Sequence, residues 1–329
     1  VYASGDFILD GGAGLITYNR IARWDGSAWQ PMATGMSSSV YALAYGPDGR
    51  LYAGGQFTQD GSGTQLYNLI VYWEDDAWHN LGAGISNNAV RALAFDGSGG
   101  LLVGGTFTDG GGVAAADRVA RWSSTGGWEP LGVGIENGGV YALAWDGANI
   151  FAGGNFTKAG GLPASGIAIW DGAGWSALGD GVNGYVYALQ WDGGGLFVGG
   201  SFTLDGSGVN PYSRVAYWSG GGWTALEYNG VNGVNNAVRT LLLDGAGDLW
   251  LGGVFDTAGG ITVDGVARWD GAAWSSTGQG LDGAVYALVW DGLDSFYAGG
   301  DFTHAGGVPA NRVARWDGVR WHALGSGME

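Results

Sequence analysis

The chain has no cysteine and little positive charge. The absence of cysteine from its 329 residues excludes disulfide bonds, thiolate nucleophiles and cysteine-based metal sites. Its 13 lysines and arginines stand against 30 aspartates and glutamates, so the formal net charge is −17. Nucleic acids and anionic membranes attract basic surfaces, so we expect neither as a partner of this chain.

Long apolar runs and helical periodicity are also missing. No apolar run approaches the roughly 18 residues that a membrane span needs, so we expect no direct membrane insertion. No signal peptide is recognisable, and Val1 begins in the middle of a pattern. We therefore expect the chain to be a piece of a longer protein. Hydrophobic residues make up 46% of it, which is too many for a disordered chain despite its 70 glycines.

One pattern recurs along the whole chain. It consists of a short apolar strand, usually two glycines, one variable residue, then phenylalanine and usually threonine. The seven phenylalanines are Phe7, Phe57, Phe107, Phe156, Phe202, Phe255 and Phe302. Their numbers differ successively by 46 to 53 residues, a period that indicates a repeat architecture.

The repeat that begins at Val140 predicts four short strands. Residues 140–145 alternate small and large apolar side chains with period two, which indicates a strand buried on both faces. Asp146-Gly147 is a turn signal, and residues 150–154 form the second strand. A glycine-rich loop leads to the third strand at 167–170, and the fourth is 175–178.

Each repeat also carries two tryptophans, one on the third and one on the fourth strand. The first members are Trp24, Trp73, Trp122, Trp170, Trp218, Trp269 and Trp316, and the second are Trp29, Trp78, Trp128, Trp175, Trp223, Trp274 and Trp321. Tryptophans could be stacking platforms for sugars. Because they recur at fixed places in every strand pair, we interpret them, with the seven phenylalanines, as structural core positions.

Four antiparallel strands in each of seven repeats predict an all-β fold, a seven-bladed β-propeller. Stacked repeats share a continuous core, so we expect one domain over 1–329. The repeats are 1–39, 40–89, 90–139, 140–185, 186–237, 238–284 and 285–329. First strands begin at Val40, Val90, Val140, Val186, Val238 and Val285. The first blade is therefore expected to lack its innermost strand within this chain. A β-solenoid is the alternative, although its repeats are shorter.

These residues carry a resemblance to known repeats. Leu51-Tyr52-Ala53-Gly54-Gly55, followed by Trp73 and Trp78, resembles the kelch motif, with tryptophan where kelch repeats usually have tyrosine. The Gly-Gly-x-Phe-Thr extension, with Ile/Val-Ala-x-Trp and Trp-x-x-Leu-Gly, is similar to the repeats of fungal cortical cell-polarity marker proteins and of uncharacterised bacterial surface proteins, notably in the Chloroflexi. The resemblance covers all seven repeats. It implies a propeller at the cell surface or outside the cell, and no particular activity.

Several polar residues could hold metals, although each has a structural interpretation. His79 and His322 occupy equivalent places in different repeats, so we do not expect them to converge on one metal; His304 is the third histidine. The Asp-Gly turns at Asp96 and Asp244 could supply oxygens to calcium. Turn chemistry explains them without a metal.

Other polar residues could bind anions or carry a glycan. Arginine precedes the first tryptophan in four repeats, at Arg23, Arg121, Arg268 and Arg315. This row could bind anions; alternatively, each guanidinium stacks on a tryptophan or pairs with a turn aspartate. Asn155-Phe156-Thr157 is formally a glycosylation sequon. It falls at the variable position of the repeat, so we interpret it as chance.

The sequence predicts a binding protein rather than an enzyme. No long, unlike loop interrupts the repeats, and no carboxylate pair, Ser/His/Asp set or phosphate loop is recognisable. We therefore expect no catalytic residue, metal or cofactor. The predicted function is a noncatalytic scaffold or protein-binding module of a cell-surface or extracellular assembly, with other proteins of that assembly as partners.

The alternatives are a multivalent carbohydrate-binding lectin, with glycans as ligands, and, third, a propeller enzyme. Exposed aromatic residues in the loops would favour a lectin. The few candidates lie at unequal places in the repeats: Tyr18, Tyr67, Tyr185, Tyr212 and Tyr228.

Overall fold

The computed structural model describes residues 1–12, 16–113 and 116–329, and these residues form strands, turns and loops. The predicted repeats 1–39 and 90–139 thus each contain a few positions outside the described residues. Among the described residues, no helix is long and apolar enough to span a bilayer. The expectation of an all-β fold is confirmed.

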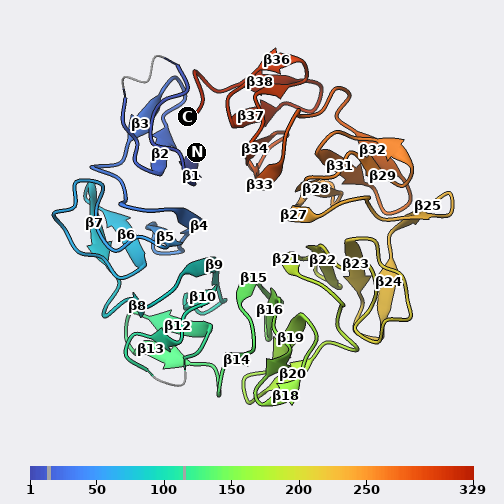
Figure 1. The fold of residues 1–329 in the computed structure, drawn as a ribbon, viewed down its shortest axis with the longest axis horizontal. Coiled ribbons are helices and arrows are strands. Elements are labelled where there is room, and N and C mark those ends of the chain that lie inside the picture. Colours follow the sequence, from blue (N-terminus) through green and yellow to red (C-terminus); the bar gives the residue numbers. More distant parts are fainter. Residues whose placement is uncertain (13–15, 114–115) are drawn as a thin grey trace. The chain divides into compact units, whose positions relative to one another are not determined.

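Six four-stranded antiparallel sheets follow one another along the chain (Figure 1). Their first strands are β4 Val40–Tyr45, β9 Val90–Phe95, β15 Val140–Trp145, β21 Val186–Trp191, β27 Val238–Leu243 and β33 Val285–Trp290. Their second strands are β5 Leu51–Gly55, β10 Leu101–Gly105, β16 Ile150–Gly154, β22 Leu196–Gly200, β28 Leu249–Gly253 and β34 Phe296–Gly300. As predicted, each second strand ends at the glycine pair.

The third and fourth strands carry the tryptophan pairs. The third strands are β6 Ile70–Glu74, β12 Val119–Ser123, β19 Ile167–Trp170, β23 Val215–Trp218, β31 Val266–Trp269 and β37 Val313–Trp316. The fourth strands are β7 Ala77–Asn80, β13 Gly127–Pro130, β20 Trp175–Ala177, β24 Trp223–Ala225, β32 Trp274–Ser276 and β38 Trp321–Ala323. The two tryptophans of each pair face each other across the ladder, with ring centroids 4.9 to 5.6 Å apart in all seven repeats.

Short strands also occupy the connecting loops, which the sequence had presented as irregular. They are β8 Ile85–Ser86, β11 Asp109–Gly110, β14 Ile135–Glu136, β17 Lys158–Ala159, β18 Leu162–Pro163, β25 Glu227–Tyr228, β26 Val231–Asn232, β29 Thr257–Ala258, β30 Ile261–Thr262, β35 His304–Ala305 and β36 Val308–Pro309. In the fourth repeat, for example, β17 pairs with both β14 and β18. The expected glycine-rich loop at 158–166 is therefore a small hairpin.

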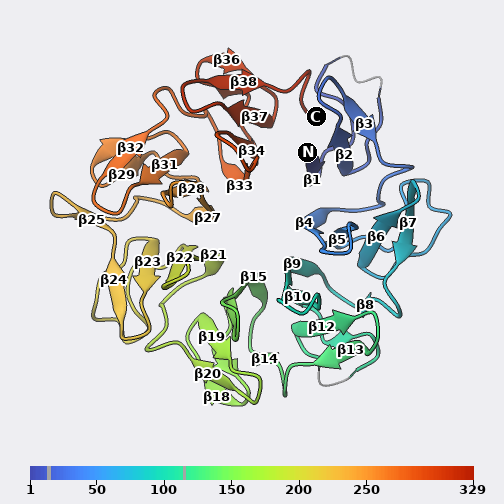
Figure 2. The ribbon, with the colours of Figure 1, turned by 180° about the vertical axis from the view of Figure 1, so that it is seen from behind.

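The described chain forms two compact units. The first comprises Val1–Asp10 and Gly14–Leu178, and the second comprises Gly11–Ala13 and Gly179–Glu329. Within the first unit, β4 contacts β9 and β9 contacts β15; within the second, β21 contacts β27 and β27 contacts β33. Consecutive sheets of one unit thus pack through their first strands, and Figure 2 shows the same strands from behind.

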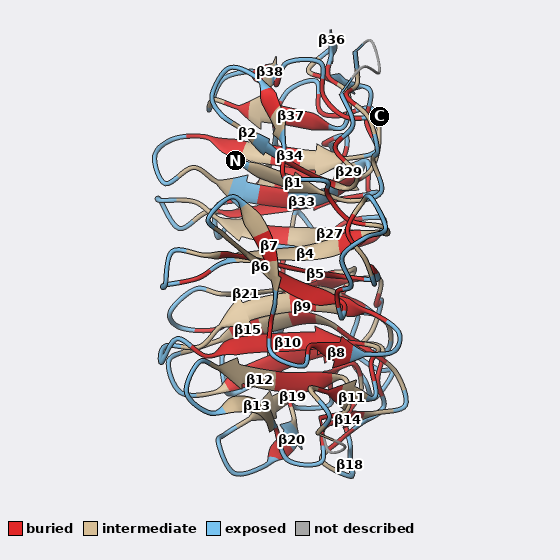
Figure 3. Ribbon diagram, turned by 90° about the vertical axis from the view of Figure 1, so that its left-hand side faces the viewer, coloured by how far each residue is buried: buried red, intermediate tan, exposed pale blue. Residues whose placement is uncertain are grey.

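In five of the six four-stranded sheets the second strand is the most deeply buried, and β34 of the last sheet is the exception. All five residues of β10 are buried, as Figure 3 shows by colour, and the same holds for β5, β16 and β28. The first strands are less buried than predicted. In β15, Val140, Ala142 and Ala144 are buried, whereas the larger side chains between them are only half-buried.

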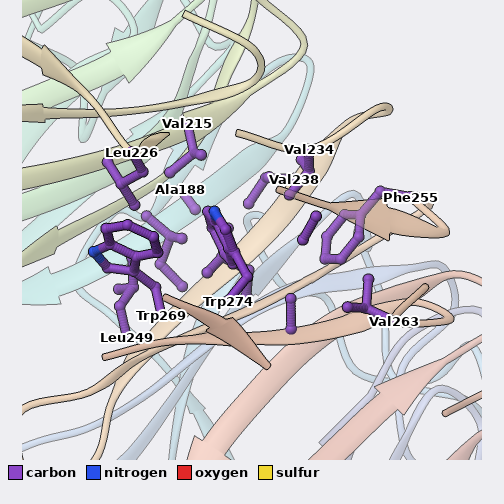
Figure 4. Packing of buried hydrophobic residues seen from close by; sticks show 14 residues of the cluster. Ala188, Val215, Leu226, Val234, Val238, Leu249, Phe255, Val263, Trp269 and Trp274 are labelled. Carbon is purple, nitrogen blue, oxygen red and sulfur yellow. The ribbon is translucent and has the colours of Figure 1, made fainter. Parts of the chain in front are cut away.

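The core of the second unit illustrates the packing between repeats (Figure 4). Phe255, Trp269 and Trp274 of one repeat pack with Val215 and Leu226 of the repeat before it. Six pattern phenylalanines are among the most deeply buried large residues: Phe57, Phe107, Phe156, Phe202, Phe255 and Phe302 are each at most 2% exposed. Phe7, in the first repeat, is half-buried.

The first sheet has three strands among the described residues: β1 Tyr2–Ser4, β2 Ile21–Trp24 and β3 Trp29–Pro31. Because β1 leads into Phe7 as β5 leads into Phe57, β1 corresponds to a second strand. This agrees with the expectation that the first repeat has no first strand. β1 is the edge of its sheet, and all three of its residues are half-buried where those of β5 are buried.

Three longer loops bury a tyrosine and an aspartate, which corrects the expectation that their tyrosines are exposed. Tyr18, Tyr67 and Tyr212 are 2 to 8% exposed. Each hydroxyl lies 3.4 to 3.5 Å from the backbone oxygen of the second tryptophan of its own repeat, and donates to it. The three positions are therefore equivalent. The aspartates that share these loops, Asp10, Asp60 and Asp205, are 2 to 8% exposed.

Asp205 shows how such an aspartate is held. Its Oδ1 accepts the Ser207 hydroxyl at 2.8 Å and the Val209 amide at 2.9 Å, and its Oδ2 accepts Nδ2 of Asn210 at 2.6 Å. Burial opposes ionisation, but these hydrogen bonds outweigh it and lower the pKa of Asp205 to about 2.

We predict that Asp205→Asn is less stable than the wild type at pH 7, and that the difference in their free energies of unfolding becomes smaller as the pH falls. A depressed folded-state pKa stabilises the fold above the unfolded-state value of about 3.9, and that contribution is lost as the pH falls towards about 2. Urea denaturation at pH 7, 4 and 2 measures it. A gap that stays constant over this range would contradict the assignment.

We predict that Trp175→Ala costs more stability than Trp170→Ala. Trp175 is 5% exposed and its Nε1 donates to the Leu131 oxygen at 2.8 Å, whereas Trp170 is half-buried. Removing Trp175 should cost about 3 to 5 kcal/mol, as for other buried large-to-small changes. Equal losses for the two variants in chemical denaturation would argue against this difference.

The open edge of β1 yields a third prediction. A peptide with the sequence of residues 285–291, which are a first strand and its following aspartate, should pair with β1 and raise the melting temperature in a concentration-dependent way. A scrambled peptide is the control. Melting temperatures that respond equally to both peptides would show that this edge does not accept a first strand.

Candidate functional site

The second residue of every first strand is a tyrosine or an arginine. These six residues, which we call the bulge residues, are Tyr41, Arg91, Tyr141, Tyr187, Arg239 and Tyr286. At each one the pairing with the second strand shifts. Val40 pairs with Gly55 and Ala42 with Gly54, so that no residue of β5 lies opposite Tyr41 in the ladder. The same shift occurs in the other five sheets. A β-bulge of this kind leaves its residue outside the ladder and re-aims the side chain.

The bulge depends on the second glycine of each pair. A Cβ atom on Gly55 would lie 2.1 Å from the backbone oxygen of Ser39, the residue before the strand. That oxygen instead accepts the amide of Gln56 at 2.9 Å. In the second unit, a Cβ on Gly200 would lie 1.9 Å from the Tyr185 oxygen. Only glycine leaves room for this carbonyl, and the carbonyl brings the variable residue of the pattern beside the bulge residue.

In the first unit the bulge residues of two neighbouring sheets stack. The guanidinium carbon of Arg91 lies 3.9 Å from the centre of the Tyr41 ring, which is a close cation–π contact. The Tyr41 hydroxyl lies 3.0 Å from Oε1 of Gln56 and donates to it. Tyr41 and Arg91 are half-buried, and Gln56 is exposed. The stack therefore lies at the surface of the unit, next to a polar side chain.

The second unit repeats this arrangement. Arg239 lies 4.2 Å above the Tyr187 ring, and Tyr185 stacks on Tyr187 with centroids 5.7 Å apart and planes 22° apart. On the next sheet, the Tyr286 hydroxyl donates to Oδ2 of Asp301 at 2.8 Å. This hydrogen bond, burial and the charge of Asp301 raise the pKa of Tyr286, and the positive charge of Arg239 opposes the rise. Tyr185 and Tyr286 are 43% and 49% exposed.

The two bulge arginines differ from the arginines that the sequence had singled out. Nε of Arg121 lies 2.6 Å from Asp96, and Arg268 is paired with Asp248. Arg315 donates to Ser295, while Arg23 is exposed. For Arg121 and Arg268 the structure thus favours pairing with an aspartate of a turn.

The histidines and the Asp-Gly turns have local partners. His79 stacks on Tyr72 with centroids 5.2 Å apart, and the rings of His304 and His322 contact Asp282 and Asp317 at 3.0 and 2.6 Å. Among the described residues, no group of three or more metal-ligating side chains occurs.

Oxygens of the two candidate calcium loops accept hydrogen bonds within their turns. Oδ1 of Asp96 accepts the amides of Ser98 and Gly100 at 2.9 and 2.8 Å. Asp244 accepts the Asp248 amide on Oδ1 and Nε1 of Trp250 on Oδ2, at 3.0 and 2.9 Å. These contacts are the turn chemistry that the sequence suggested as the simpler interpretation. In the sequon, Oδ1 of Asn155 accepts the Gly139 amide at 2.7 Å.

Sequence reasoning missed the bulge residues as a set. It placed Tyr141 in a regular strand of period two over residues 140–145, buried on both faces, and it considered only the arginines before the tryptophans. A signal was present, because the second position is always tyrosine or arginine while the first position is always valine. Both residue types are large and polar, which an entirely buried strand would not accommodate.

No family model matches the chain, and no curated protein matches it. Among solved structures it is similar to the extracellular domain of a one-component system from B. thetaiotaomicron, with 16% identity and a TM-score of 0.60 over 92% of this chain and 38% of that one. It thus spans about two fifths of that protein's length.

Two enzymes of known structure are also similar to this chain. Virginiamycin B lyase from Staphylococcus aureus is 13% identical, with a TM-score of 0.53 over 90% of this chain and 91% of the lyase. The acylaminoacyl peptidase of Pyrococcus horikoshii is 13% identical, with a TM-score of 0.51 over 92% of this chain and 47% of the peptidase. At such identities the similarity concerns the fold alone. This chain is all-β and built of antiparallel sheets, and the folds of these neighbours are propeller-like.

Proposed function

We propose that this chain is a seven-bladed, kelch-like β-propeller that acts as a noncatalytic module and binds other proteins at the cell surface or outside the cell. In this proposal residues 1–329 belong to a single domain with seven blades. Binding takes place at the bulge residues, and it requires stacking and hydrogen bonds rather than a reacting group.

A hydrogen bond that recurs between successive repeats supports the ring. A glycine amide donates to a glycine oxygen of the preceding repeat over 2.8 to 3.0 Å. The pairs are Gly61–Gly35, Gly111–Gly84, Gly160–Gly134, Gly206–Gly181, Gly259–Gly233 and Gly306–Gly280. A seventh bond of the same kind joins Gly11, in the first repeat, to Gly327 in the last, at 3.0 Å. A closed ring of seven predicts this bond, because in such a ring the first repeat follows the last.

The type, position and stacking of the bulge residues are the main support for the binding function. Tyrosine and arginine are the residue types that, with tryptophan, dominate the energy of protein interfaces. Here they lie where the pairing of the first and second strands shifts register, and a β-bulge of this kind re-aims the side chain. Their stacking in both units holds the rings and guanidinium groups in fixed orientations, which reduces the entropy lost on binding.

An extracellular setting is supported by the similarity to the extracellular domain of the B. thetaiotaomicron protein. The resemblance of the repeats to those of surface proteins supports the same setting. The second candidate function, a lectin, is favoured by one observation, the exposed Tyr185 stacked on Tyr187. Such a flat aromatic pair could receive the face of a sugar ring.

A comparison of two tyrosines on one strand tests the proposal. Tyr41 and Tyr45 lie near opposite ends of β4, and Tyr45 is 65% exposed. The chain is screened against a phage-displayed peptide library and against a glycan array. We expect it to enrich peptides whose affinity falls about tenfold or more in Tyr41→Ala, as for a hot-spot residue, and stays unchanged in Tyr45→Ala.

Three outcomes would contradict the proposal. If glycans bind and peptides do not, the lectin is the better account. If Tyr45→Ala weakens peptide binding as much as Tyr41→Ala, the bulge is not the site. If neither library yields a ligand, the proposed binding function is wrong.

A further inference from the structure

Arg91 and Arg239 stand apart from the other arginines because part of each guanidinium is buried without an acceptor. Among the described residues, Nε of both side chains is inaccessible to solvent and has no hydrogen-bond partner. Their recorded contact is the face of a tyrosine, Tyr41 or Tyr187. A tyrosine face attracts the cation but accepts no conventional hydrogen bond, so the terminal Nη–H groups of the fork keep no acceptor within the described residues.

Several other arginines of the chain have hydrogen-bond acceptors. Arg118 donates to the Ile135 oxygen at 3.0 Å, and Arg312 donates to the Met328 oxygen at 2.7 Å. Arg121 contacts Asp96 at 2.6 Å, in a chain with 30 carboxylate side chains. Buried polar groups in folded proteins are normally paired, and an unpaired one needs an explanation. Arg91 and Arg239 occupy the same position of two repeats and are half-buried. Because each Nε is covered, only the terminal Nη groups of the fork can meet a ligand.

We propose that Arg91 binds a carboxylate group of the partner, and that Arg239 forms a second, weaker copy of this site. The inference rests on the proposed function, since it names the chemical group recognised at the bulge residues. A guanidinium held flat against an aromatic ring presents its N–H groups along its edge, and this planar fork matches the two oxygens of a carboxylate. Tyr41 fixes that orientation for Arg91, and its own hydroxyl is held by Gln56.

The charge of the chain favours a single carboxylate over a more highly charged group. The net charge of −17 repels anions at long range, and it repels a dianion more strongly than a monoanion. Each site supplies one guanidinium, which balances one negative charge. Near Arg239, the Tyr286 hydroxyl holds the carboxylate of Asp301, whose charge opposes a second anion. We therefore expect Arg91 to bind more tightly than Arg239.

Arginine side-chain NMR tests the inference without knowledge of the natural partner. The chain, labelled with ¹⁵N-arginine, is titrated at constant ionic strength with N-acetylglutamate α-amide, which carries one side-chain carboxylate. N-acetylglutamine α-amide is the neutral control. The Nε–H resonance of Arg91 should shift saturably with the first probe alone, and that of Arg239 should shift with weaker affinity. The resonance of Arg121, already paired with Asp96, should not move.

The variant Arg91→Lys keeps the charge and removes the planar fork, so it should weaken binding of the probe at the first site by about tenfold or more. Its melting temperature serves as the folding control. Arg91 and Arg121 resonances that move alike, or no saturable shift, would overturn the inference. A tighter response to inorganic phosphate than to the carboxylate probe would also overturn it. Peptide binding that requires Tyr41 but survives Arg91→Lys would reject the carboxylate site and leave the proposed function standing.

Discussion

The close approach of neighbouring chain segments at the paired glycines is the constraint on which each repeat depends. A Cβ on Gly54 would lie 2.4 Å from Cγ1 of Val90 on the next sheet, and a Cβ on Gly55 would lie 2.1 Å from the Ser39 oxygen. Because Gly54 has no side chain, two sheets can pack against each other. Because Gly55 has none, the chain can enter its first strand with a bulge. Both distances are far below any real Cβ contact, so a larger residue at either place would displace the backbone or the valine.

This constraint separates the residues that build the fold from those that are free to vary. Valine, phenylalanine and tryptophan recur because they fill the space between sheets, and the paired glycines recur because they leave room for close approach. The pattern phenylalanines from Phe57 onward are fully buried. The bulge residue has no partner in the ladder, so the repeat tolerates tyrosine or arginine there. Repeated folds commonly carry function at such positions, because changes in them leave the scaffold intact.

The sequence predicted the all-β fold, the strand order within the sheets and the three-stranded first sheet, because these follow from the period and from paired residue types. It did not predict the bulge. A strict period of two places residues 140–145 in a regular strand, whereas the pairing with β16 shifts register between Val140 and Ala142, at Tyr141. The shift arises from the carbonyl of Gly139, which occupies the place of a Cβ on Gly154. That contact joins two segments that are distant in sequence, so local patterns do not report it.

The buried tyrosines of the longer loops were misjudged for a similar reason. Tyr67 and Tyr212 lie in glycine-rich, polar stretches, which are typical of exposed loops. Each reaches back to the fourth strand of its repeat, where its hydroxyl meets the oxygen of Trp78 or Trp223. A buried aspartate organises the same loop through short hydrogen bonds. The sequence of such loops shows no periodic pattern, because tertiary contacts rather than regular strands fix their structure.

Hydrogen exchange in Gly55→Ala tests most directly whether the glycine pair sets the bulge and hence the site. The added methyl group meets the Ser39 oxygen, so we predict loss of amide protection in β4, Val40–Tyr45, together with loss of the Arg91–Tyr41 stack. Gly174→Ala is the matched control, because a Cβ there has nothing within 4 Å. Unchanged protection of β4 in Gly55→Ala, equal to that in Gly174→Ala, would contradict the account.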